Sequence, residues 1–204
     1  GLTVRNGTIV ERQALAAVGQ GLLMQIYEKL FSEYGQTVAQ ILLTRSDIGD
    51  RKRYLNARNT VLTLLKYRVI PIINENDSVA TEELKIGQND TLSALVADLI
   101  EADLLILLSD VDGLYTKDPK KDGSAELIPV ITDITPEIIS MAGGAGSKLG
   151  TGGMITKLEA AKMAMAAGIS MVLMNGSDPS RIQLIFSGQP VGTVFLSSHS
   201  VVSS

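Results

Sequence analysis

Short apolar runs alternate with longer segments of helical periodicity along this chain of 204 residues, and this alternation limits the folds open to it. The runs are apolar almost throughout, as in strands that are covered on both faces of a parallel sheet. They occupy residues 38–44, 69–74, 103–109, 170–174 and 193–196. The helical segments lie near residues 11–34, 51–67, 91–101 and 154–167. Alternation of this kind predicts an α/β fold with a mostly parallel sheet.

The charge and composition exclude several classes of function. A net charge of −4 argues against a nucleic acid or an anionic membrane held by bulk charge, and no apolar run approaches the length of a membrane span. The absence of cysteine excludes disulfides and thiolate chemistry and fits a cytoplasmic protein. The single histidine, His199, lies in a Ser-rich tail. The chemistry must therefore depend on Asp, Asn, Lys, Ser, Thr and backbone amides.

Polar side chains gather where four of the predicted strands end. In chain order they are TRSD at 44–47, NEND at 74–77, SD at 109–110 and NG at 175–176. Ligands of open α/β sheets bind outside the carboxyl ends of the strands. Each cluster could be an ordinary polar turn, because Asn, Asp and Ser favour turns. Their occurrence at four strand ends favours a binding site.

Two of these stretches offer groups for a small charged substrate. Asp77 supplies a carboxylate suited to a substrate ammonium group. Asn89 and Asp90 precede an apolar helical stripe, so either residue could simply cap that helix. A cap needs only one residue, however, so Asn89 could bind a small substrate while Asp90 orients a lysine or a metal ion.

The stretch GTGGMITK at residues 150–157 predicts a phosphate-binding loop that leads into a helix. It is not a P-loop, because the P-loop lysine follows the last glycine directly. Gly152 and Gly153 allow close approach of the backbone, and the start of a helix offers unpaired N–H groups. Lys157, one turn into the helix, adds a full positive charge. Ser109 and Asp110 fit a position near the phosphates or a metal ion, although they could also form a plain exit from a strand.

These stretches together resemble the glutamate 5-kinases of the amino acid kinase superfamily, from about residue 11 to residue 196. The motifs that carry the resemblance are RQALAAVGQGLLM (12–24), RYLNARNT (53–60), IPIINENDSVA (71–80), GQNDTLSALVA (87–97), LLSDVDGLYTKDP (107–119) and GTGGMITK (150–157). The resemblance implies a three-layer αβα sandwich with a mainly parallel central sheet. It also implies transfer of the γ-phosphoryl group of ATP, with Mg²⁺, to the side-chain carboxylate of L-glutamate, as the first step of proline synthesis.

The resemblance also implies a role for each motif residue. Asp77 and Asn89 would bind glutamate, Asp90 would organise the catalytic lysines, and Lys157 would stabilise the transition state. The ATP-binding residues would be Ser109, Asp110, Thr151, Gly152, Gly153, Met154, Ile155, Thr156 and Lys157. No general base is required, because a glutamate carboxylate is already ionised at neutral pH.

The family pattern differs from this sequence in three respects, the mildest being Ser109 in place of a more usual Thr. Gln88 stands where members often have Asp. The family's opening strand and its Lys-x-Gly turn are missing before Gly1, so we expect residues 1–196 to be a kinase domain without its N-terminal strands, followed by a tail at 197–204. A homo-oligomer and feedback inhibition by proline are further expectations. The alternatives are a uridylate kinase-like enzyme of the same fold, or a non-catalytic module that binds an amino acid and a nucleotide.

Overall fold

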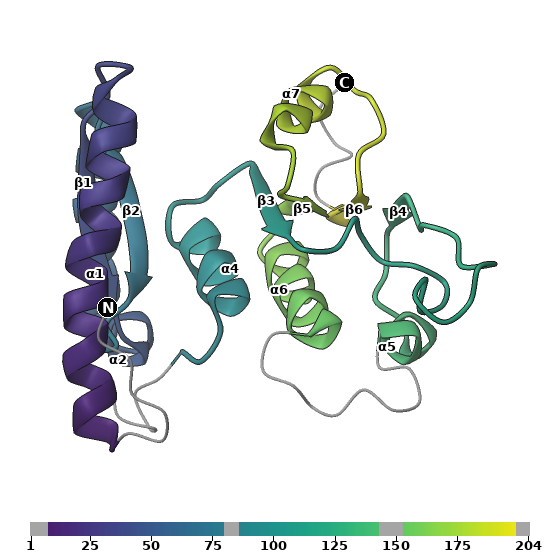
Figure 1. The fold of residues 1–204 in the computed structure, drawn as a ribbon, viewed down its shortest axis with the longest axis horizontal. Helices are drawn as coiled ribbons and strands as arrows, with labels where there is room; N and C mark the ends of the chain where they lie inside the picture. Colours follow the sequence, from purple (N-terminus) through teal and green to yellow (C-terminus); the bar gives the residue numbers. More distant parts are fainter. Residues whose placement is uncertain (1–7, 80–85, 143–152, 199–204) are drawn as a thin grey trace. The chain divides into compact units, whose positions relative to one another are not determined.

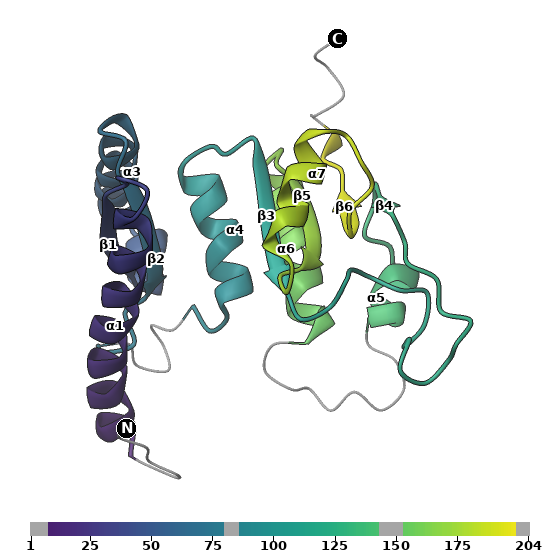
Figure 2. The ribbon, with the colours of Figure 1, turned by 45° about the horizontal axis from the view of Figure 1, so that its top comes forward.

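A computed structural model of the chain describes residues 8–79, 86–142 and 153–198 (Figure 1). The chain divides into two compact units, Gly1–Asn89 and Asp90–Ser204. Helices and strands alternate through both units, as the sequence predicts (Figure 2). Among the described residues, no helix is both long enough and apolar enough to cross a membrane.

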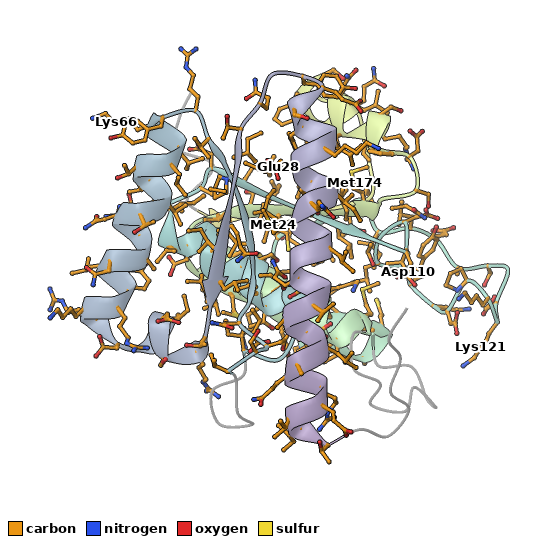
Figure 3. The ribbon with its side chains drawn as sticks, turned by 60° about the vertical axis from the view of Figure 1, so that its left-hand side comes forward. Met24, Glu28, Lys66, Asp110, Lys121 and Met174 are labelled. Atoms are coloured by element: carbon orange, nitrogen blue, oxygen red, sulfur yellow. The ribbon has the colours of Figure 1, made fainter. Side chains whose placement is uncertain are left out.

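The first unit consists of a parallel strand pair and its helices. The elements are α1 (Ile9–Ser32), β1 (Val38–Leu43), α2 (Arg45–Gly49), α3 (Arg51–Lys66) and β2 (Ile70–Glu75). In the pairing of β1 with β2, Val38 lies opposite Ile70 and Leu43 lies opposite Glu75. The helices α1 and α3 lie on either side of this pair (Figure 3). Both strands end at the same edge, so the residues that follow them come together there.

The second unit contains the larger sheet. Its elements are α4 (Asn89–Leu99), β3 (Leu104–Ser109), β4 (Val130–Ile131), α5 (Pro136–Ala142), α6 (Met154–Ala166), β5 (Ser170–Asn175), η1 (Pro179–Arg181), α7 (Ile182–Phe186) and β6 (Thr193–Phe195). The strand order is β3-β5-β6-β4. The β3–β5 and β4–β6 pairs are parallel, whereas β5 and β6 are antiparallel.

The core of the second unit forms around β5, which is buried on both faces. On one face Met171 and Leu173 belong to a cluster that includes the α6 residues Ala160 and Ala164. The small alanine side chains let α6 lie close to the sheet. On the other face Val172 and Met174 pack against side chains of α7. The central residues Met171–Met174 are therefore all apolar, because neither face of this part of the strand meets water.

The predicted α/β class and the mainly parallel pairing are confirmed, as are the strand segments and the helices, to within a few residues. The end of α6 is confirmed as well, because Gly168 follows it with φ +82°, a conformation that favours glycine. The sequence did not predict α2, β4, α5 or α7. It also did not predict the antiparallel β5–β6 pair. The described strands pair as β1-β2 in the first unit and β3-β5-β6-β4 in the second.

Candidate active site

A buried lysine and a carboxylate meet where α4 and α6 begin. The Lys157 Nζ donates to Asp90 Oδ2 at 3.0 Å, and the Thr156 hydroxyl donates to the same oxygen at 2.7 Å. The exposed fraction is 9% for the Lys157 side chain and 16% for that of Asp90. A full positive charge is therefore held almost out of solvent by one carboxylate from another helix.

The position of Lys157 within α6 is unfavourable without that partner. It lies in the first turns of the helix, where the backbone dipole is positive and disfavours a cation. Asp90 lies in the first turn of α4, where the same dipole favours an acidic side chain. An ammonium group has three donors, and the described residues accept only one of them from Lys157.

Among the described residues, no side chain caps the N-terminus of α6. Gly153 is the N-cap residue and provides no side chain to accept from the first N–H groups. Met154 and Ile155 follow it as the first helical residues. The predicted site residues Thr151 and Gly152 lie outside the described residues.

A pocket of about 890 Å³ lies in the second unit. Its walls are the loop of residues 110–122, the end of α5 and the first residue of α6, Met154. Its volume is within the range of sites that bind drug-sized ligands, roughly 300–1,000 Å³. Of the residues predicted to contact the nucleotide, Asp110 and Met154 line this pocket, and the Ser109 hydroxyl donates to Asp110 Oδ1 at 3.1 Å.

Polar contacts fix the wall of the large pocket. The Asp112 carboxylate accepts from the Tyr115 hydroxyl at 3.2 Å and from the Asn175 amide at 3.0 Å. Burial, with the adjacent Asp112 as a further cause, raises the pKa of the Tyr115 hydroxyl. Asp112 thus joins the loop after β3 to the end of β5.

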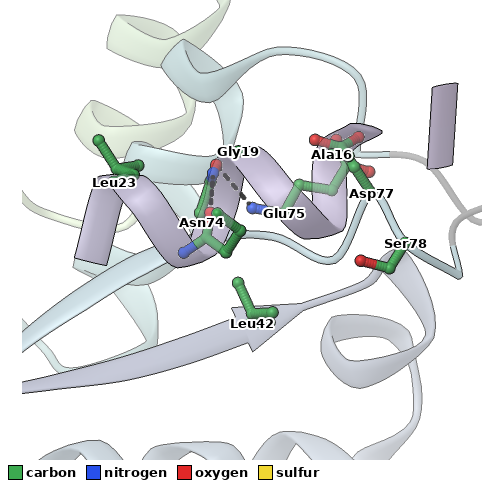
Figure 4. Close-up of a pocket in the computed structure, with 9 residues that line it drawn as sticks. Ala16, Gly19, Leu23, Leu42, Asn74, Glu75, Asp77 and Ser78 are labelled. Atoms are coloured by element: carbon green, nitrogen blue, oxygen red, sulfur yellow. Dashed lines mark hydrogen bonds between the residues drawn. The ribbon is translucent and has the colours of Figure 1, made fainter. Parts of the chain in front are cut away.

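A second, smaller pocket of about 230 Å³ lies in the first unit, between α1 and the ends of β1 and β2 (Figure 4). Asn74, Glu75 and Asp77 line it from the end of β2 and the residues after it. The Asn74 amide donates to Gln20 Oε1 of α1 at 3.0 Å, which fixes the orientation of Asn74. Asp77 is exposed, so its charge is accessible to a ligand.

Glu75 is buried in this unit and ties the end of β2 to the segment before α4. Its carboxylate accepts from the backbone N–H of Ile86 at 2.6 Å and from that of Gly87 at 3.4 Å. Asn89, two residues after Gly87, is exposed at the start of α4. Glu75 therefore helps to place Asn89. The sequence did not predict this role, because the NEND stretch at 74–77 is typical of a polar turn.

The described residues include no group of three Asp, Glu or His side chains that could hold a metal ion. In kinase sites, Mg²⁺ usually keeps several waters and binds one or two carboxylates together with substrate phosphates. Asp110, exposed at the edge of the large pocket, is a carboxylate of that kind.

Comparison with known proteins assigns the chain to a family. The sequence model of the amino acid kinase family matches residues 3–175. The glutamate 5-kinase of Moorella thermoacetica is 54% identical over 196 residues, which are 96% of this chain and 52% of that protein. The glutamate 5-kinase of Clostridium tetani is 55% identical over 195 residues, 96% of this chain and 73% of that protein. The chain thus spans about half the length of the Moorella protein and 73% of the length of the Clostridium protein.

Solved structures share the fold at lower identity. Isopentenyl phosphate kinase of T. acidophilum matches with a TM-score of 0.57 and 22% identity, over 88% of this chain and 71% of that one. UMP kinase of Bacillus anthracis matches with a TM-score of 0.55 and 18% identity, over 94% of this chain and 66% of that one. At this level of identity the likeness concerns the fold alone.

Proposed function

Because this chain belongs to the amino acid kinase family, we propose that it transfers the γ-phosphoryl group of ATP to the side-chain carboxylate of L-glutamate. The observation that carries the proposed chemistry is the Lys157 ammonium, buried at the start of α6 and paired with Asp90. The proposed substrate is supported by the identity of 52–56% to proteins named glutamate 5-kinase.

Phosphoryl transfer depends on positioning and charge neutralisation rather than on a covalent nucleophile. The donors of Lys157 and the N–H groups of Gly153, Met154 and Ile155 would bind the phosphate oxygens as charge moves toward the leaving group. Asp90 would hold the ammonium in place, and because it is itself anionic it would leave only part of the lysine charge for the phosphates. Mg²⁺, when bound with the nucleotide, neutralises phosphate charge, and Asp110 would hold it.

The acceptor needs no proton removed, since the side-chain carboxylate of glutamate is ionised at neutral pH. We propose that Asp77 pairs with the α-ammonium group and that Asn89 hydrogen-bonds the substrate. Asn74, held by Gln20, would line the same pocket. Ser109 and the large pocket of the second unit would take the nucleotide.

We further propose, from the resemblance alone, that the product enters proline synthesis and that proline inhibits the enzyme. The same resemblance supports a homo-oligomer in the cytoplasm, with residues 1–196 as kinase domain. Gel filtration of the purified protein and ADP release with added proline test two of these points.

A coupled ADP-release assay tests the proposed activity. The protein encoded by the complete gene is supplied with MgATP and, separately, with glutamate, aspartate or UMP. We expect ADP release that depends on glutamate and is much slower with the other two. Release that depends on UMP would favour a uridylate kinase. Binding of glutamate and ATP without any ADP release would favour a non-catalytic module.

A further inference from the structure

One buried hydroxyl joins both ends of the loop that lines the large pocket. This loop, residues 114–128, lies within the connection from β3 to β4, and Lys121 lies at its outer part (Figure 3). Thr193, the first residue of β6, has an exposed fraction of 0%. Its Oγ1 accepts from the Leu114 N–H at 2.8 Å and donates to the Ile128 carbonyl at 2.7 Å. The two loop ends also pair directly, with Ile128 N–H to the Leu114 carbonyl at 2.8 Å.

The backbone around this hydroxyl has no spare room. A Cβ on Gly192, which has φ +63°, would lie 2.0 Å from the Leu173 carbonyl oxygen of β5. A Cβ on Gly113 would lie 2.5 Å from Thr193 Oγ1. Both positions therefore require glycine, one to bring the start of β6 against β5 and the other to bring the loop against Thr193.

The hydroxyl has one proton to donate, so its two contacts use its donor and one of its acceptor positions. A valine side chain would fill nearly the same volume without either bond. The buried Leu114 N–H and the partly buried Ile128 carbonyl would then each lose a partner, which is costly for groups removed from water. The contacts within the rest of the loop, such as the ion pair of Lys117 with Asp122, lie at the surface and are weaker constraints.

We propose that Thr193 is a positioning residue that fixes the 114–128 loop and thereby sets the affinity of the large pocket for a nucleotide. The loop carries Tyr115 and Lys117 into the pocket wall, so displacement at its base moves both side chains. The inference rests on the proposed function, because it takes the ligand of this pocket to be ATP. Thr193 itself does not line the pocket and would act only through the loop.

The test compares Thr193→Val, which removes both hydrogen bonds, with Thr193→Ser, which keeps the hydroxyl. Thr63→Val is the matched control, because that threonine also donates to a backbone carbonyl, at 2.7 Å, but on the exposed side of α3. Affinity for the non-hydrolysable analogue AMP-PNP is measured by calorimetry, and the KM values for ATP and glutamate are measured by ADP release. Hydrogen exchange of the Leu114 amide reports directly on the anchor.

In Thr193→Val we expect AMP-PNP to bind about 10-fold or more weakly, the KM for ATP to rise in parallel and the Leu114 amide to exchange faster. The KM for glutamate and the turnover at saturating ATP should change less than about twofold. Thr193→Ser should restore the affinity to within about twofold, and the control should not differ from the parent. If Thr193→Val does not fold, Thr193→Cys replaces it, because a thiol fills similar space but forms weaker hydrogen bonds. We expect Thr193→Cys to bind AMP-PNP more weakly than Thr193→Ser does.

Unchanged AMP-PNP affinity in folded Thr193→Val would overturn the inference and leave the proposed function intact. Equal loss of ATP and glutamate affinity, not restored by Ser, would overturn it too, because it would indicate general damage to the fold. A parent protein that binds no AMP-PNP would instead contradict the proposed function, and the nucleotide role of Thr193 with it.

Discussion

Replacing Asp90 by asparagine tests whether the carboxylate holds Lys157 in place. The substitution keeps the shape of the side chain and its ability to accept from Thr156, but removes the charge opposite the ammonium. Lys157 then remains as a mostly buried cation at the N-terminal end of α6. We expect a less stable protein and slower phosphoryl transfer, because the ammonium would no longer be held at one position.

The size of the effect follows from how far the pair is removed from water. Removing one partner of a fully buried pair costs about 3–5 kcal/mol, whereas an exposed pair contributes about 1 kcal/mol or less. Exposed fractions of 9% and 16% place Lys157 and Asp90 near the buried limit. We therefore expect a loss of about 3 kcal/mol. For a domain of this size that corresponds to a fall in Tm of roughly 6–12 °C.

The assay is thermal unfolding followed by circular dichroism, for Asp90→Asn, Lys157→Met and the double variant. Asp98→Asn is the matched control, because Asp98 lies on the same helix and is exposed, without an ion-pair partner among the described residues. The control should stay within about 0.5 kcal/mol of the parent. The double-variant cycle should give a coupling energy between Asp90 and Lys157 of about 2 kcal/mol.

A coupling energy below about 0.5 kcal/mol would refute the reasoning, since the two side chains would then contribute independently. The same holds if Asp90→Asn and Asp98→Asn unfold at the same temperature. In that case Asp90 would not be the group that keeps Lys157 in place.

Other predictions concern transfer, substrate binding and pH. Lys157→Ala should lower kcat by about 10²–10³ with a much smaller change in the KM for glutamate, and near-normal turnover would remove Lys157 from the mechanism. Asp77→Asn should weaken glutamate binding by about 2 kcal/mol, or about 30-fold, while the KM for ATP stays constant; a parallel loss of both would indicate a structural role. Hydrogen bonds from Lys117 and Ser124 hold the pKa of the Asp122 carboxyl well below its usual range. Their stabilising effect is thus present above the ordinary carboxyl pKa of about 4 and is lost as the pH falls from there through the lowered pKa of the folded state. A lower protection factor of the Ser124 amide against hydrogen exchange, corrected for the intrinsic rate at each pH, would reveal the loss.

The sequence predicted the elements whose burial is uniform along their length. All of β5 except Asn175 is buried, so its apolar run stands out without any knowledge of its neighbours. By contrast, β4 consists only of Val130–Ile131 and α7 only of Ile182–Phe186. Elements this short do not show the periodic spacing of apolar residues that identifies a strand or a helix. The antiparallel pairing of β5 with β6 depends on contacts across the sheet, for which the local sequence carries no signal.

The same distinction applies to the candidate site. Glycines and a lysine in one short stretch pointed to Lys157, and the structure places its ammonium beside Asp90, 67 residues earlier in the chain. The roles of these two residues remain predictions. Thr193 gave no signal, because a threonine in the run TVF fits an ordinary strand, and its partner Leu114 is 79 residues away. Gln20 was equally hidden within a long helix, although it lies in one of the quoted motifs.

The central claim is that the side-chain carboxylate of glutamate attacks the γ-phosphorus of ATP, and isotope transfer tests it directly. Glutamate with ¹⁸O in its side-chain carboxylate is incubated with MgATP and the protein encoded by the complete gene, and hydroxylamine is added to cleave the acyl phosphate. The account predicts that the released inorganic phosphate carries one ¹⁸O atom per molecule, because the carboxylate oxygen becomes the bridging oxygen and leaves with phosphorus. Phosphate without ¹⁸O, formed at the same rate with and without glutamate, would contradict the account and show hydrolysis of ATP by water.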